Sequence, residues 1–124
     1  MNDETKLKYL SMALYLFGAI FIVGVWAMMQ LWPYGWAWTP AQPEYVQMIL
    51  GIYATLGVFL ILAAKNPLEH RSLISFTIWS SAVHAAIMLV QAMRDPTESG
   101  HLIGDVPALF LVAFVLWYLL PKRQ

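Results

Sequence analysis

The side chains best suited to chemistry lie in the third apolar stretch of the sequence, at about residues 72–93. His84 is near its middle, where a membrane-spanning helix would be deepest in the bilayer. Ionisable residues are costly there and usually face a cavity or the interior of a helix bundle. Positions three and four residues apart share one helix face, so we expect a polar stripe that binds a ligand or forms a polar core. The stripe consists of Thr77, Ser80, Ser81, His84, Met88 and Gln91.

Two interpretations of His84 stay open. As a functional group it would relay protons, ligate haem or polarise a bound ligand. As a structural group it would be a neutral imidazole that bonds to Ser81 or Gln47 and holds helices together. A haem held by two histidines of one chain is disfavoured, because His70 is fourteen residues away, or about 21 Å along a helix, and His101 lies at the outer end. A symmetric pair from two chains is the alternative.

A second group of candidate ligands lies near the start of the fourth apolar stretch. Glu98, His101 and Asp105 are three and four residues apart, which would put them on one side of a helix. Carboxylates and imidazole bind Zn or Ca, although this set is not specific for a metal. The competing expectation is that Asp105 is the N-cap of the fourth helix, with Pro107 in its first turn. The chain has no cysteine, so thiolate sites are excluded and we expect no resident cofactor.

Membrane-spanning helices must position these groups, because the chain is too apolar for a soluble domain. Of its 124 residues, 60% are hydrophobic and 11% are charged, whereas a soluble domain carries about 25% charged residues. A span needs roughly 20 mostly apolar residues. We therefore predict an all-α membrane protein, a single domain over residues 1–124, with four transmembrane helices in two antiparallel hairpins. The predicted spans are about residues 7–31, 45–64, 72–93 and 101–120.

The distribution of lysine and arginine predicts the orientation of the chain. Basic residues resist translocation and stay on the cytoplasmic side. Only Arg94 falls on the other side, so we predict that both termini are cytoplasmic and that the number of spans is even. The first span should be retained, because its apolar run is too long for a signal peptide and lacks a small-x-small cleavage site after it. The cytoplasmic set is Lys6, Lys8, Lys65, Arg71, Lys122 and Arg123.

The segment between the first two spans combines proline with aromatic residues. It reads LWPYGWAWTPAQPEY, from Leu31 to Tyr45. Three prolines and a glycine argue against regular helix. Amphipathic rings suit the head-group layer of a membrane, where the polar edge stays wet. The aromatic residues expected at this interface are Trp32, Tyr34, Trp36 and Trp38.

One long run of sequence carries a resemblance to a known family. The run is GIYATLGVFLILAAKNPLEHRSLISFTIWSSAVHAAIMLVQAM, with LWPYGWAW before it and GHLIGDVPALFLV after it. It resembles a family of small bacterial membrane proteins known only as a domain of unknown function. The resemblance covers nearly the whole chain, most clearly from Leu31 onward. It implies a multi-pass protein of the bacterial inner (cytoplasmic) membrane, and it implies no activity.

The leading functional hypothesis is a non-catalytic membrane module, either an accessory protein or one that binds a small ligand. It rests on a polar stripe that has no nucleophile, paired carboxylates or cofactor motif around it. Its partners would be the lipid bilayer and either a second copy of the chain or a larger membrane complex. Zero net charge makes nucleic acid a poor partner. We expect the function to lie in the second helical hairpin and the aromatic outer loop.

Two alternatives belong to other classes. A small dimeric transporter would resemble the small multidrug-resistance exporters, which carry a glutamate in the first helix, whereas residues 7–31 hold no acid. A subunit of a membrane oxidoreductase would use His84 with Gln91 and Asp105, with a quinone among the aromatic residues.

Overall fold

A computed structural model describes residues 1–40 and 42–123 of the chain, and in these residues the regular secondary structure is all helical, without a strand. Four helical segments are long and apolar enough to cross a membrane. Each begins a few residues before the predicted stretch, because the helices start in polar turns that an apolar count leaves out. The four segments are Asp3–Leu31, Pro43–Ala64, Pro67–Arg94 and Pro96–Leu119.

The first segment is continuous helix with a π-helical turn inside it. It consists of α1 (Asp3–Ala19), the π-helix η1 (Ile20–Gly24) and α2 (Val25–Leu31). The side chain of Asn2 caps α1 by accepting from the Thr5 N–H at 2.8 Å. A π-turn changes the direction of the side chains that follow it and often occurs at functional sites. In this protein the π-turn forms part of a cavity wall.

The segment between the first two spans, which we call the outer segment after its predicted side of the membrane, contains a helical turn, contrary to the prediction. The short helix α3 (Pro33–Trp36) starts with proline at its first position, where the missing N–H is not needed. Glycines let α3 lie directly against the fourth segment. A Cβ on Gly100 would be 2.5 Å from the ring of Tyr34, and a Cβ on Gly104 would collide with the backbone of Gly35.

The remaining segments are one long helix and two compound ones. The second is α4 (Pro43–Ala64), and the third is the 3₁₀-helix η2 (Pro67–His70) followed by α5 (Arg71–Arg94). In the fourth, the 3₁₀-helix η3 (Pro96–Leu102) precedes α6 (Asp105–Leu119). A 3₁₀-helix rises about 2.0 Å per residue against about 1.5 Å for an α-helix. The apolar run after residue 105 is short for a span, but η3 and α6 together form the longer segment Pro96–Leu119.

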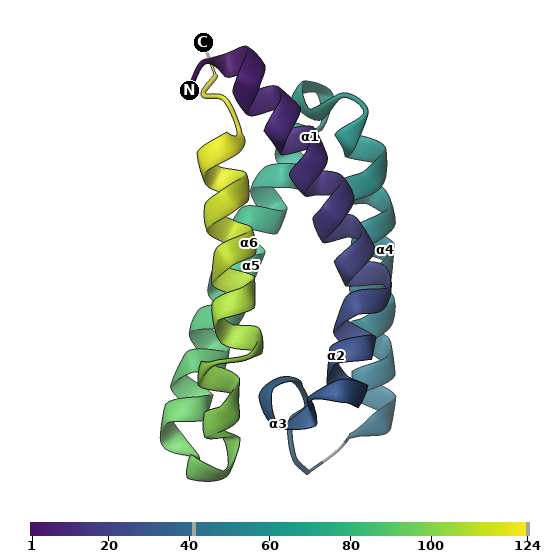
Figure 1. Cartoon of the computed structure of the whole chain (residues 1–124). Helices are drawn as coiled ribbons and strands as arrows, with labels where there is room; N and C mark the ends of the chain where they lie inside the picture. The colour runs from purple at the N-terminus through teal and green to yellow at the C-terminus, as the bar shows by residue number, and fades with distance from the viewer. Residues whose placement is uncertain (41, 124) are drawn as a thin grey trace.

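The long helices pack as two pairs, α1 along α4 and α5 along α6 (Figure 1). Both termini lie at one end of the molecule, where α1 also contacts α6. Toward the other end the two pairs diverge, and α3 lies between them against η3 (Figure 1). The core at the terminal end is closed by side chains with no exposed surface: Leu10, Leu14, Leu60, Ile74 and Leu116.

The pair α1 and α4 meets at two glycines. A Cβ on Gly57 would lie 2.5 Å from the carbonyl oxygen of Gly18, and a Cβ on Gly18 would lie 2.7 Å from that of Gly57. In membrane helices, small residues at such contacts allow the backbones to approach closely. The same pair is held at its terminal end by the Ser11 hydroxyl, which donates to the carbonyl of Ala64.

We expect Gly57→Leu to lower the thermal unfolding midpoint of the purified protein in detergent. Its side chain must force α4 away from α1, and overpacking of this kind costs about 1–3 kcal/mol. Val58→Leu is the matched control, because Val58 is the exposed neighbour of Gly57 on the same helix. Equal midpoints for the two variants would show that the glycine contact does not hold the pair together.

Candidate functional site

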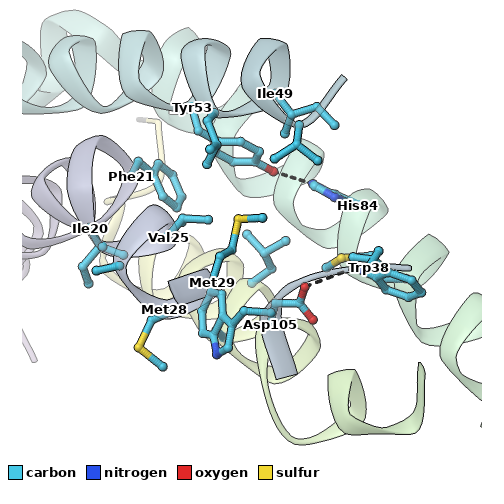
Figure 2. Close-up of a pocket in the computed structure, with 18 of the residues that line it drawn as sticks. Ile20, Phe21, Val25, Met28, Met29, Trp38, Ile49, Tyr53, His84 and Asp105 are labelled. Carbon is cyan, nitrogen blue, oxygen red and sulfur yellow. Dashed lines mark hydrogen bonds between the residues drawn. The ribbon is translucent and has the colours of Figure 1, made fainter. Parts of the chain in front are cut away.

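A cavity of about 730 Å³ lies between the two helix pairs. Its volume is in the range of small-molecule sites, about 300–1,000 Å³. All four candidate spans and the outer segment contribute to its walls, which are mostly apolar. The first two spans thus contribute to the cavity together with the second hairpin and the outer loop, where the sequence analysis expects the function. Apolar lining residues from these two spans include Ile20, Phe21, Val25, Met28, Met29 and Ile49 (Figure 2).

Part of the cavity wall is formed by residues that are exposed on the surface of the molecule. Five lining residues are exposed: Pro40, Gln42, Tyr45 (64%), Ile49 (49%) and Leu111 (57%). Tyr45 and Ile49 belong to α4 and Leu111 belongs to α6, so all three lie within candidate spans. The exposed part of the cavity wall therefore includes residues of two candidate spans as well as of the segment between the first two spans.

His84 takes part in the cavity wall together with a tyrosine. The hydroxyl of Tyr53 on α4 and Nδ1 of His84 on α5 form a hydrogen bond (Figure 2). The ring of Phe21 packs edge-on against Tyr53, with centroids 5.1 Å apart. The partner of His84 is thus Tyr53, in place of the Ser81 or Gln47 suggested by the sequence. A tyrosine inside an apolar helix resembles a lipid-facing residue, so its role was missed.

The other members of the predicted stripe are placed differently from one another. The hydroxyl of Thr77 donates to the Leu73 carbonyl at 2.9 Å, and that of Ser80 donates to the Thr77 carbonyl at 3.4 Å, so both bond within their own helix. Ser81 is buried, and Gln91 is exposed near the C-terminal end of α5. Only two members of the stripe, His84 and Met88, line the cavity.

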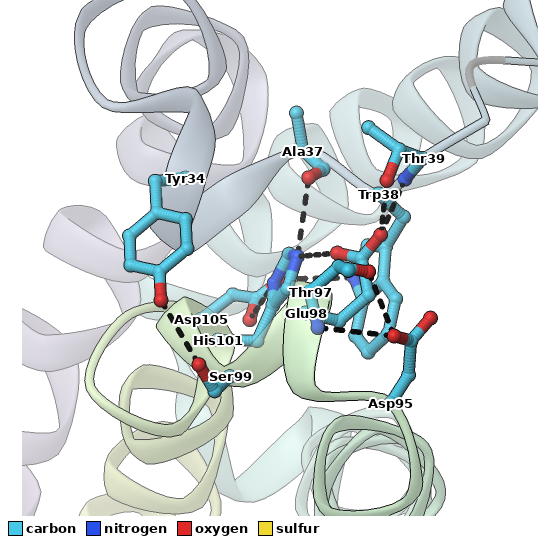
Figure 3. Close-up of polar contacts among 10 residues, drawn as sticks. All are labelled: Tyr34, Ala37, Trp38, Thr39, Asp95, Thr97, Glu98, Ser99, His101 and Asp105. Carbon is cyan, nitrogen blue, oxygen red and sulfur yellow. Dashed lines mark hydrogen bonds and ion pairs between the residues drawn. The ribbon is translucent and has the colours of Figure 1, made fainter.

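The second predicted group is brought together in a buried hydrogen-bond network (Figure 3). His101 has no exposed surface. Its Nδ1 is 2.8 Å from Oδ1 of Asp105, and its Nε2 is 3.1 Å from Oε2 of Glu98. Nε2 is also 3.1 Å from the carbonyl oxygen of Ala37. Because that carbonyl can only accept, Nε2 carries a proton.

The outer segment completes this network. The ring of Trp38 stacks on His101, with centroids 3.9 Å apart, and its Nε1 donates to Oδ2 of Asp105 at 3.4 Å. Oε1 of Glu98 accepts from the backbone N–H of Thr39 at 2.8 Å and from its hydroxyl. Thus residues 37–39 are held by the fourth segment through polar contacts that depend on both carboxylates.

The geometry of this network differs from that of a metal site. His101 lies between the two carboxylates and uses one ring nitrogen on each, so Glu98, His101 and Asp105 do not converge on one point. Among residues 1–40 and 42–123, no group of three or more histidine, aspartate or glutamate side chains is placed to hold a metal ion. The N-cap prediction is also wrong: Gly104 is the N-cap of α6, and the carboxylate of Asp105 turns to His101 and Trp38.

Two tryptophans of the outer segment contribute to the cavity wall, which the sequence does not predict. Trp36 and Trp38 are half-buried and line the cavity, although the sequence predicts them in the head-group layer. The ring of Trp32 lies against Gly35, and the hydroxyl of Tyr34 bonds to that of Ser99 at 2.9 Å. These contacts fold the segment inward over the cavity.

Asp105 belongs to the buried network with His101, and it also lines the cavity that Tyr53 and His84 line (Figures 2 and 3). The cavity therefore has apolar walls with a few polar groups, chiefly Tyr53, His84 and Asp105. Such an arrangement binds a mainly apolar molecule and orients its polar end.

Comparison with known proteins gives a family without an assigned activity. The model of a family described as "Family of unknown function (DUF6632)" matches residues 4–122. No curated protein and no solved structure matches the chain. The matched range includes both polar groups and the cavity between them.

Proposed function

The chain belongs to this family of unknown function, and from the cavity we propose that it is a non-catalytic membrane module that binds a small, mainly apolar ligand. The observation that carries the proposal is the cavity of about 730 Å³ with apolar walls and a few polar groups. A molecule with an apolar body and one polar end would bury the body against the walls and direct its polar end to Asp105 or to the Tyr53–His84 pair.

The proposal includes the setting of the module. We infer a single domain, residues 1–124, in the bacterial cytoplasmic membrane with both termini in the cytoplasm. Six of the seven lysines and arginines support this orientation, because basic residues remain on the cytoplasmic side. The large apolar side chains exposed on the long helices support a lipid surround. Examples are Ile52, Phe76, Trp79, Phe114 and Trp117.

Extraction of the purified protein tests the proposal. We expect mass spectrometry of the solvent extract to show one class of apolar molecule enriched over its level in the host membrane. Ala108→Trp, which fills the cavity, should remove this enrichment. Ala86→Trp adds the same side chain at an exposed position of α5 and should retain it.

The composition of the extract decides between ligand binding and the alternatives to it. An extract with the composition of the bulk membrane, unchanged by Ala108→Trp, would reject ligand binding. Enrichment of a quinone would favour the oxidoreductase subunit that the sequence left as an alternative.

A further inference from the structure

The polar group that best defines the ligand is the carboxylate of Asp105. Its residue is only 8% exposed, yet it forms part of the cavity wall. It is also one end of the Glu98–His101–Asp105 network. The net charge of this network therefore acts on whatever occupies the cavity.

We infer that the cavity selects an apolar molecule with a positively charged head group, such as a lipophilic amine. This inference rests on the proposed function, because it names the chemical class of the ligand in the same cavity. It follows from the charge of the network, the surroundings of the cavity and the nature of its walls.

The hydrogen bonds fix how many protons the network holds. Glu98 accepts from the N–H and the hydroxyl of Thr39 and from Nε2 of His101. Asp105 accepts from Trp38 Nε1 and shares a proton with Nδ1 of His101. The backbone N–H of Thr39 and the protonated Nε2 of His101 can only donate to Glu98, and a carboxylate is the acceptor for such donors. With one proton in the Nδ1–Oδ1 bond and one on Nε2, the two carboxyl groups and the imidazole together carry one uncompensated negative charge, on whichever side of the Nδ1–Oδ1 bond the proton lies.

That charge has no partner within the part of the chain that the structure describes. The ion pairs that the two carboxylates make there are both with His101. None of the residues that line the cavity is a lysine or arginine. A buried charge without a partner is unfavourable, so a cation in the cavity would offset it.

The cavity walls suit a cation with an apolar body. Ring faces attract cations, particularly where water is displaced. A carboxylate or phosphate head group would be repelled by Asp105, and a neutral head group would leave the charge uncompensated. The aromatic side chains that line the cavity are Phe17, Phe21, Trp36, Trp38, Tyr45 and Tyr53.

Three probes that differ only in their head group test whether the cavity prefers a cation. Dodecylamine, dodecanol and dodecanoate share one chain length and are titrated at pH 7 into phosphatidylcholine nanodiscs that contain the protein, with empty nanodiscs as baseline. Tryptophan emission reports binding, because Trp36 and Trp38 line the cavity. We expect the amine to bind about tenfold more tightly than the alcohol, since hydrogen bonds to charged groups are stronger than neutral ones, and dodecanoate to bind more weakly than both.

Two variants remove the charge in different ways. Asp105→Asn changes the cavity wall, whereas Glu98→Gln leaves it intact and makes the network neutral with Asp105 still present. Both should reduce the preference for the amine to within about twofold. Glu44→Gln removes an exposed acid from the first turn of α4, outside the cavity, and should keep the tenfold preference.

The outcomes separate this inference from the proposed function. Equal binding of the amine and the alcohol, or tighter binding of dodecanoate, overturns the cation preference and leaves ligand binding in place. Failure of all three probes to bind counts against both. A preference for the amine that survives in folded Asp105→Asn and Glu98→Gln also overturns the inference, because the charge would not be its cause.

Discussion

Replacing His101 by leucine is expected to destabilise the protein by about 3–5 kcal/mol, the range found when one partner of a buried ionic group is removed. His101 has no exposed surface, and its nitrogens lie 3.1 Å from a Glu98 oxygen and 2.8 Å from an Asp105 oxygen. Leucine fills much of the same space but donates no hydrogen bond. Two carboxylates would then face each other in a buried site without a cation between them.

Unfolding in detergent, followed by temperature and by titration with sodium dodecyl sulfate, measures this loss. His70→Leu is the control: His70 is half-buried in η2 at the terminal end of the molecule, and its replacement should change stability by less than about 0.5 kcal/mol. The triple variant Glu98→Gln, His101→Leu, Asp105→Asn should recover much of the loss, because the unpaired charges are gone. If His101→Leu unfolds like His70→Leu, the network does not stabilise the fold.

Gly104→Ala is expected to separate α3 from the start of α6. The added Cβ would collide with the backbone of Gly35, and a backbone cannot rotate out of the way as a side chain can. The helix α3 must move, and Trp38 would lose its stacking on His101 and its bond to Asp105. Overpacking costs about 1–3 kcal/mol, and the lost contacts add to it.

Tryptophan fluorescence measures this displacement. We expect Gly104→Ala to shift the emission to longer wavelength and to increase quenching by acrylamide, with a lower unfolding midpoint. The control Gly51→Ala adds the same methyl group where nothing lies within 4 Å, and it should be neutral or stabilise its helix by about 0.5–1 kcal/mol. Spectra that match the wild type would mean that α3 tolerates the methyl group.

The helical class and the four apolar segments follow from the sequence because bilayer thickness sets how long an apolar run must be. The proximity of Glu98, His101 and Asp105 follows for a similar reason, since spacings of three and four bring side chains together on any helical turn. Periodicity operates within one segment. It therefore finds groups whose members are close in the chain.

The rest of the site depends on contacts between distant positions. Trp38 and Asp105 are 67 residues apart, Thr39 and Glu98 are 59 apart, and Tyr53 and His84 are 31 apart. Proline and aromatic residues in the outer segment predict an interfacial loop, and composition alone does not reveal that it folds inward. The sequence names both His84 and Asp105 as candidates, but the cavity that they share becomes visible only in the structure.

Tyr45, Ile49 and Leu111 line the cavity and are exposed on candidate spans, where lipid would surround them, so the proposed ligand would reach the cavity from the bilayer. A ligand that arrives through lipid competes with acyl chains for the cavity. Its mole fraction in the bilayer therefore determines how far the cavity is occupied. Its concentration in water matters only because it sets that mole fraction through partitioning. Each methylene favours transfer from water to the bilayer by about 0.8 kcal/mol. Transfer from bilayer to cavity exchanges one apolar medium for another, so homologues of different tail length should saturate the site at nearly the same mole fraction.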